Sequence, residues 1–284
     1  MKILATALLG GLITATLVRT APGYGSTEER LDPRRNAENL RRLEAATTGE
    51  ANVIRYYAAF LVNYARGDLG QSALFQKPVR ALIADRILST AVAVGAGLVG
   101  GWVLALVIGV LGAFRFGSAF HWPVQGAAVL LQSIPASVLA FLLLVFGWRG
   151  AVACAGALAL ILYPRLVQYV FNLVETAAAM PHCTTARAKG VGELSMLLRH
   201  TLPVILPELI ALTGVSVSMA LSVSIPLEMI LDAPGIGQLA WQAALGRDMT
   251  LLVNLTILFS IVISAANGMA GCFSARRSGE RMAI

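Results

Sequence analysis

Four serines recur along one apolar stretch of the chain, and their hydroxyl groups could act as nucleophiles. They are Ser216, Ser218, Ser222 and Ser224. A serine nucleophile needs an adjacent base, and the histidines, His121, His182 and His200, all fall in predicted loops. Hydroxyls that satisfy helix contacts or line a wet path are therefore the favoured interpretation. An intramembrane enzyme of the serine hydrolase type remains the alternative.

Motifs for other chemistries are missing from the sequence. There is no G-x-x-x-x-G-K-[ST] phosphate loop and no H-E-x-x-H zinc motif. Cys154, Cys183 and Cys272 form no C-x-x-C pair, so neither a zinc site nor a disulfide framework has a starting point. We therefore expect a chain that is not an enzyme and that has no metal site, no cofactor and no ATP site of its own.

The composition decides which elements position these side chains. Of 284 residues, 57% are hydrophobic and 13% charged, and the mean hydropathy is +0.74, whereas a soluble domain carries about 25% charged residues. The lipid bilayer is therefore the expected solvent. The net charge of +7 is compatible with nucleic-acid binding, but membrane proteins collect Lys and Arg in cytoplasmic loops, so we expect no nucleic-acid partner.

Six apolar runs approach or reach the roughly 20 residues that cross a bilayer. They are residues 3–18, 87–114, 124–146, 151–174, 204–229 and 251–273. We expect an all-α integral membrane protein with six transmembrane helices. The first run is short enough for a secretory signal, but no clean A-x-A site precedes Pro22. We therefore assign residues 1–20 as the first transmembrane helix.

The positive charges predict the orientation of these spans. An even number of spans places both termini on one side of the membrane, and Lys and Arg are enriched in short cytoplasmic loops. If the termini are cytoplasmic, the short outer segments hold only Arg149 and Arg247. We therefore predict cytoplasmic termini, an extracytoplasmic segment at residues 21–86 and a five-helix core at residues 87–284.

The stretch at residues 184–203 is the one well-charged segment deep among the apolar runs. Its charged side chains are separated by alanines and leucines at roughly helical spacing, with Gly190 and Gly192 interrupting the pattern and Pro203 closing it. This pattern predicts two short helices with a hinge. The charge count places the loop in the cytoplasm, where another protein can contact it.

Polar residues inside the spans are candidates for lining a translocation pathway, or for packing contacts between helices. The candidates are Gln132, Ser133, Ser137, Ser218, Ser222 and Asn254. Ionisable residues at membrane depth are few, namely Arg165, Glu208 and Glu228, so ion-coupled transport is disfavoured. Residues 232–248 predict a short helix at the outer membrane surface or an ordinary amphipathic connector.

The charged stretch resembles the cytoplasmic EAA loop of ATP-binding-cassette importer permeases, whose pattern is E-A-A, three residues, G, nine residues, I-x-L-P. Ala186 and Gly190 hold their positions, and nine residues then lead to His200 and to Leu202 and Pro203. Thr184 replaces the acid, Thr185 the first alanine and His200 the isoleucine. A-R-A-K-G followed by R-H-x-L is the form found in the oligopeptide, dipeptide and nickel permease family.

Two more motifs are similar to the first, or B-type, permease of that family. One is the R-G-D-L-G-Q-S sequence that begins at Arg66. The other is E-x5-P-G-x-G, which begins at Glu228 and is followed by Arg247 and Asp248. Because three motifs occur in the right order, the chain is identified as a member of this family.

The resemblance implies the type I permease fold in the bacterial inner membrane, crossed several times, and import of peptides or a similar small solute. The implied partners are a second, C-type permease, two cytoplasmic ATPases that bind ATP and Mg, and a solute-binding protein. The EAA loop, within residues 174–203, would dock on an ATPase. That role is carried over to seven residues: Ala186, Arg187, Ala188, Lys189, Gly190, Leu202 and Pro203.

Overall fold

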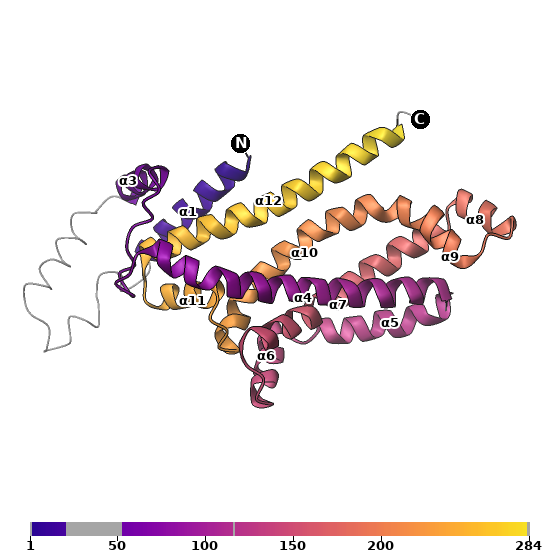
Figure 1. Cartoon of the computed structure of the whole chain (residues 1–284), viewed down its shortest axis with the longest axis horizontal. Coiled ribbons are helices and arrows are strands. Elements are labelled where there is room, and N and C mark those ends of the chain that lie inside the picture. Colours follow the sequence, from indigo (N-terminus) through magenta and orange to yellow (C-terminus); the bar gives the residue numbers. More distant parts are fainter. Residues whose placement is uncertain (1, 21–52, 116, 283–284) are drawn as a thin grey trace, which may run out of the picture. The chain divides into compact units, whose positions relative to one another are not determined.

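The computed structural model describes residues 2–20, 53–115 and 117–282, and in these ranges the regular structure is helical (Figure 1). One isolated bridge, between Gln71 and Pro78, is the exception. The all-α prediction is therefore confirmed for the described residues. Residues 21–52 of the predicted extracytoplasmic segment lie outside the described residues.

The helices are α1 (Lys2–Thr20), α3 (Val53–Ala65), α4 (Val79–Arg115), α5 (Gly117–Gln132), α6 (Ala136–Val145), α7 (Gly150–Ala178), α8 (Pro181–Ala188), α9 (Glu193–Met196), the π-helix η2 (Leu197–Thr201), α10 (Leu202–Ile230), α11 (Ile236–Leu245) and α12 (Met249–Met282).

Five of the six predicted apolar runs are each helical throughout the described residues, and the third, residues 124–146, is helical on both sides of a break at residues 133–135. By length and composition, four helical segments in the described part of the chain can cross a membrane: Val79–Val110, Gly150–Ala178, Leu197–Ile230 and Met249–Gly271. Trp122–Gln132 and Ala136–Val145 form a bent pair of helices, which make a fifth crossing if the pair counts as one span. The apolar part of α1, Ala5–Val18, is shorter.

The third predicted span is not one continuous helix. Residues 124–146 divide into α5 and α6, which meet at an angle of 81°. Pro135, with φ −58° and ψ 141°, directly precedes α6, and proline both lacks an N–H and disfavours helical geometry in the residue before it. Conversely, α4 runs without a break through Arg86 and Ile87, where a boundary was expected.

The chain forms two compact units, one of residues 1–86 and 239–262 and the other of residues 87–238 and 263–284. In the first unit, α1 packs on α3 and on the first half of α12. Tyr57 is buried there and donates a hydrogen bond of 2.6 Å to the Leu8 carbonyl, and burial raises the pKa of this phenol. The boundary predicted at residue 86 is of another kind, because it separates the extracytoplasmic segment from the membrane core. That boundary stays a prediction.

In the second unit, α4, α5 and α10 pack around α7. Gly97, Gly101 and Gly109 lie at intervals of four and eight residues on one face of α4, and a Cβ at Gly97 would stand 2.6 Å from the Cβ of Leu158. Small residues let helices approach closely in lipid. Figure 1 shows α8 and α9 at one end of α7 and α10, and the turn from α10 into α11 at the other.

Candidate functional site

The candidate coupling loop is folded into short helices. Helix α8 ends at Ala188, and Gly190 follows with φ +76°. The N–H of Gly190 donates to the Arg187 carbonyl at 3.0 Å, and the N–H of Val191 donates to the Ala186 carbonyl at 3.2 Å. This pair of bonds is a Schellman motif, which needs a left-handed residue where glycine stands. The predicted pair of short helices with a break at Gly190 is confirmed.

A small buried apolar cluster lies between the short helices of this loop. Cys183, Ala186 and Met196 are buried, and Val191 packs against them. The contact between Val191 and the end of α8 is the hydrophobic contact that accompanies a Schellman motif. The loop is therefore stabilised by contacts among its own residues.

The remaining predicted coupling residues divide by exposure. Arg187, Ala188, Lys189 and Gly190 are all exposed. Leu202 opens α10 after the π-helical turn and packs on the cluster that joins α7 to α10, and Pro203, also exposed, follows it in the first turn. The loop thus presents a basic exposed surface and is tied at its base to two membrane spans. Its role in coupling stays a prediction.

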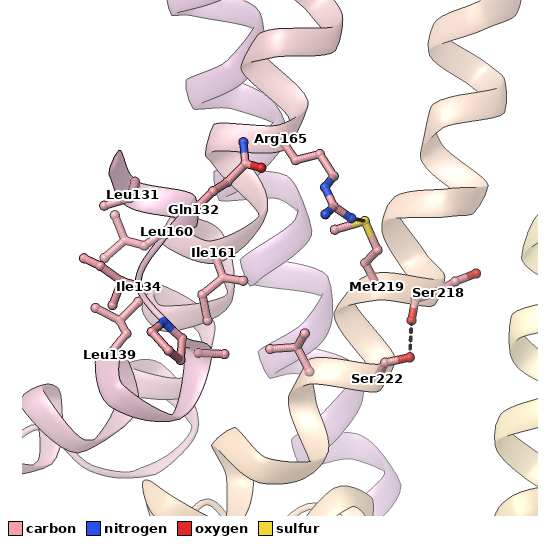
Figure 2. A pocket seen from close by; sticks show the side chains of 13 residues that line it. Leu131, Gln132, Ile134, Leu139, Leu160, Ile161, Arg165, Ser218, Met219 and Ser222 are labelled. Carbon is pink, nitrogen blue, oxygen red and sulfur yellow. Dashed lines mark hydrogen bonds between the residues drawn. The ribbon is translucent and has the colours of Figure 1, made fainter. Parts of the chain in front are cut away.

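A cavity of about 500 Å³ lies among α5, α6, α7 and α10 (Figure 2). Its walls are mainly apolar, from residues such as Leu160 and Ile161. Its polar lining residues are Gln132, Arg165, Ser218 and Ser222. A largely apolar pocket of roughly 300–1,000 Å³ with a few convergent polar groups is typical of small-molecule sites.

The structure brings together three of the six predicted pathway residues in this cavity: Gln132, Ser218 and Ser222. Ser133 and Ser137 flank Pro135 at the break between α5 and α6 and are not among the lining residues. Asn254 lies in the other compact unit, where it is buried and its side-chain amide donates to the Leu69 and Thr250 carbonyls at 3.0 and 2.8 Å. A pathway role for any of the six stays a prediction.

Arg165 was not among the predicted pathway residues, although it lines the cavity. It projects from α7 toward α10, and its Nη1 lies 3.5 Å from the sulfur of Met219 (Figure 2). The sequence contained a usable signal, because a charged residue at membrane depth is rare and commonly functional. The apolar lining residues carried no such signal.

The four serines of α10 use their hydroxyls inside the helix. Each donates to a carbonyl three or four residues earlier, at 2.8 to 3.1 Å. Ser216 also accepts a hydrogen bond of 3.1 Å from the indole of Trp102, and Ser218 accepts one of 2.9 Å from Asn267. These hydroxyls therefore satisfy helix contacts, as the favoured interpretation held, and Figure 2 shows Ser218 and Ser222 one turn apart at the cavity.

The E-x5-P-G-x-G motif forms a compact cap on α11. Glu228 is 1% exposed, and its Oε2 accepts hydrogen bonds from the N–H groups of Gly237, at 2.7 Å, and Gln238, at 3.2 Å. Thr90 Oγ1 accepts the N–H of Ile236 at 2.7 Å. The N–H of Gly235 donates to the Ala233 carbonyl at 2.8 Å, so all four N–H groups that a helix start leaves unpaired have partners, and the carboxylate lies at the positive end of the helix dipole. We refer to this arrangement as the α11 cap.

Ser72, the last residue of the R-G-D-L-G-Q-S motif, meets Asp248 in the other compact unit. Ser72 donates to Asp248 Oδ2 at 2.5 Å, and the same oxygen accepts the N–H of Leu74 at 3.1 Å. The other carboxylate oxygen accepts the N–H of Leu251 at 3.0 Å, at the start of α12. Asp248 therefore caps α12 and fixes the turn at residues 72–75, which gives these matching residues a structural explanation.

Comparison with known proteins agrees with these features. Residues 105–278 match the family model described as the binding-protein-dependent transport system inner membrane component. The oligopeptide transport system permease protein OppB of Escherichia coli K12 is 30% identical over 269 residues, which cover 87% of this chain and 85% of that one. OppB of Salmonella typhimurium has the same identity and coverage. A putative peptide transport system permease protein of Brucella suis biovar 1 is 24% identical over 290 residues, covering 92% of this chain and 90% of that one.

These matches support a permease and lend no support to the intramembrane enzyme. With its apolar helices and the type I permease fold, this chain belongs to the binding-protein-dependent transport system inner membrane components, and it is a transport permease of the bacterial inner membrane.

Proposed function

We propose that this permease imports peptides and receives the energy for import through the loop formed by α8, α9 and η2. The observation that carries the proposal is the shape of this loop. It presents exposed Arg187 and Lys189 on a self-supporting helical turn, and Leu202 joins it to the core between α7 and α10. A force applied to such a stiff element moves the spans to which it is tied.

The energy comes from partner proteins. Two cytoplasmic ATPases bind ATP and Mg and dock on the loop, a second permease completes the pathway, and a solute-binding protein delivers the peptide from outside. Peptides are proposed as the solute because the relatives are named for oligopeptide and peptide transport. The absence of a phosphate-loop sequence from this chain supports the need for separate ATPases.

In the proposed orientation both termini and the coupling loop are cytoplasmic. Arg187, Lys189 and Arg199 then lie on the cytoplasmic side, as do the C-terminal arginines. The short outer segments retain only Arg149 and Arg247, in agreement with the enrichment of basic residues in short cytoplasmic loops.

Charge reversal in the loop tests the proposal. The double variant Arg187→Glu and Lys189→Glu is expressed with the products of neighbouring genes, and the ATPases that co-purify with it are quantified. Because both side chains are exposed, we expect the permease to keep its thermal midpoint. The expected losses are at least tenfold in ATPase recovery and in ATP-driven uptake of a labelled oligopeptide into membrane vesicles.

Arg149→Glu is the matched control, since Arg149 is an exposed arginine in the turn before α7. It should retain ATPase binding and uptake. Undiminished ATPase recovery with the double variant would remove the coupling role from this loop. Failure of the wild-type assembly to take up any oligopeptide would remove the proposed solute.

A further inference from the structure

The cavity contains a cation whose partners within the described residues do not include an anion. Arg165 stands on α7 in a span of 29 residues, and its side chain is exposed at the cavity, although its neighbours Pro164 and Leu166 are buried. It donates to the thioether of Met219 at 3.5 Å, which is a weak acceptor. No carboxylate of the described residues forms an ion pair with it. A guanidinium at membrane depth usually finds an opposite charge or a water-filled cavity.

The shape of the cavity adds a second positive feature. The first turn of α6, at Pro135, Ala136 and Leu139, lines the same space. Because α6 begins at a break in the chain, its first N–H groups lack partners in a preceding helical turn, and the start of a helix carries partial positive charge. Arg165 and this helix start therefore both favour an anion in the cavity.

The geometry of an arginine narrows the choice of anion. A guanidinium has five N–H donors in a planar fork that matches a carboxylate with two parallel hydrogen bonds. Gln132, Ser218 and Ser222 add polar groups to the lining, and the other lining residues are mainly apolar. A short peptide offers both features, namely a terminal carboxylate and apolar side chains.

We propose that this cavity binds the terminal carboxylate of a transported peptide through Arg165. The proposal rests on the proposed function, because it takes peptides as the solute. It adds a specificity determinant inside the permease itself, at membrane depth, which acts after a binding protein has delivered the solute.

Three peptides that differ only at their ends test this proposal. Trialanine, N-acetyl-trialanine and trialanine amide are titrated against the purified permease complex, and the apparent affinity is taken from the rise of the thermal midpoint with peptide concentration. The wild type should bind the two peptides with a free carboxylate, and it should bind the amide at least tenfold more weakly. Arg165→Gln should make the three affinities equal within twofold, whereas Arg165→Lys should keep part of the preference.

Arg149→Gln is the matched control and should behave like the wild type. Equal binding of acid and amide by the wild type, or no binding of any peptide, would overturn the proposal. So would an unchanged preference in Arg165→Gln. Loss of the second permease from Arg165→Gln would also overturn it, because the arginine would then pair with a partner subunit.

Two further measurements separate the remaining explanations. If phosphatidylglycerol without peptide raises the midpoint of the wild type but not of Arg165→Gln, the cavity holds a lipid headgroup and the proposal fails. Oligopeptide uptake by the wild-type assembly is measured in parallel. If the wild type takes up oligopeptide but does not prefer a free carboxylate, only the cavity proposal is rejected. If the wild type takes up no oligopeptide, the proposed function itself is rejected.

Discussion

The candidate coupling loop and the α11 cap both depend on glycine, but for different reasons. Gly190 in the loop has φ +76°, and a Cβ there would meet nothing within 4 Å. Gly237 in the cap has no such backbone conformation, and a Cβ there would stand 2.7 Å from the Cα of Ile225 and 2.8 Å from Glu228 Oε2. One glycine supplies a backbone conformation and the other supplies space.

The two regions should therefore respond differently to substitution. The α11 cap is buried, and its hydrogen bonds are made inside the chain, so a change there disturbs packing in several directions. The loop has a buried underside but an exposed outer surface, which leaves its side chains available to a partner. Variants in the cap should therefore act first on stability, and variants in the loop on coupling.

The largest effect is expected from Gly237→Ala. The added Cβ would clash with both the backbone of Ile225 and the carboxylate of Glu228, and overpacking of this kind costs about 3 kcal/mol when backbone must move. The thermal midpoint of the purified protein should fall by roughly 6–12 °C. A loss no greater than that of Gly190→Ala would remove the distinction between the two glycines.

A smaller effect is expected from Glu228→Ala. It removes the acceptor for the N–H groups of Gly237 and Gln238 and should cost about 2 kcal/mol, since hydrogen bonds to charged groups contribute about 1.5–3 kcal/mol. Glu228→Gln keeps an acceptor oxygen, so the fall in its thermal midpoint should be about half of that for Glu228→Ala.

Glu208→Gln is the control for these variants, because Glu208 is an exposed carboxylate on the same helix. It should leave the midpoint unchanged. Equal losses for Glu228→Ala and Glu208→Gln would show that the cap contributes nothing specific to stability.

The smallest effect on stability is expected from Gly190→Ala, at about 1 kcal/mol for a non-glycine residue in the left-handed region. Gly190→Asn should lose less, because asparagine tolerates this conformation. The larger consequence should appear in coupling: peptide-stimulated ATP hydrolysis by the assembled complex should fall several-fold for Gly190→Ala. The open space around Gly190 means that only backbone strain is responsible.

Gly192→Ala provides the matched control two residues away. Its backbone lies outside the left-handed region, and a Cβ there would also meet nothing within 4 Å. Stability and coupled hydrolysis should both stay at wild-type levels. A coupling loss equal to that of Gly190→Ala would trace the effect to the bulk of the loop surface instead of to the Schellman motif.

Several local features of the fold were predictable because their causes are local. An apolar run long enough for the bilayer forms a helix wherever it stands in the chain, and a glycine between two short amphipathic segments predicts a helix end. The break before α6 was not predicted, although Pro135 was visible. A proline indicates that a helix ends or bends, but the angle of 81° between α5 and α6 depends on the helices against which they pack.

The candidate sites also differ in how far local sequence could predict them. The spacing from Ala186 to Pro203 was enough to predict the candidate coupling loop, since its motif is contiguous. Arg165 stood out only as a charge in a span, and its place beside Met219 required the packing of α7 on α10. The polar residues around Pro135 show the limit, because Gln132 reaches the cavity and its neighbour Ser133 does not line it.

Hydropathy and contiguous motifs are properties of neighbouring residues, so they were enough to predict a helical membrane permease with a charged loop. The packing of the helices was needed to see that Thr90 and Glu228, far apart in the chain, meet at the start of α11, and that Arg165 lines a cavity. Such meetings depend on which helix faces pack together. That choice is made by the shapes and volumes of many side chains at once, so it does not follow from any single stretch of sequence.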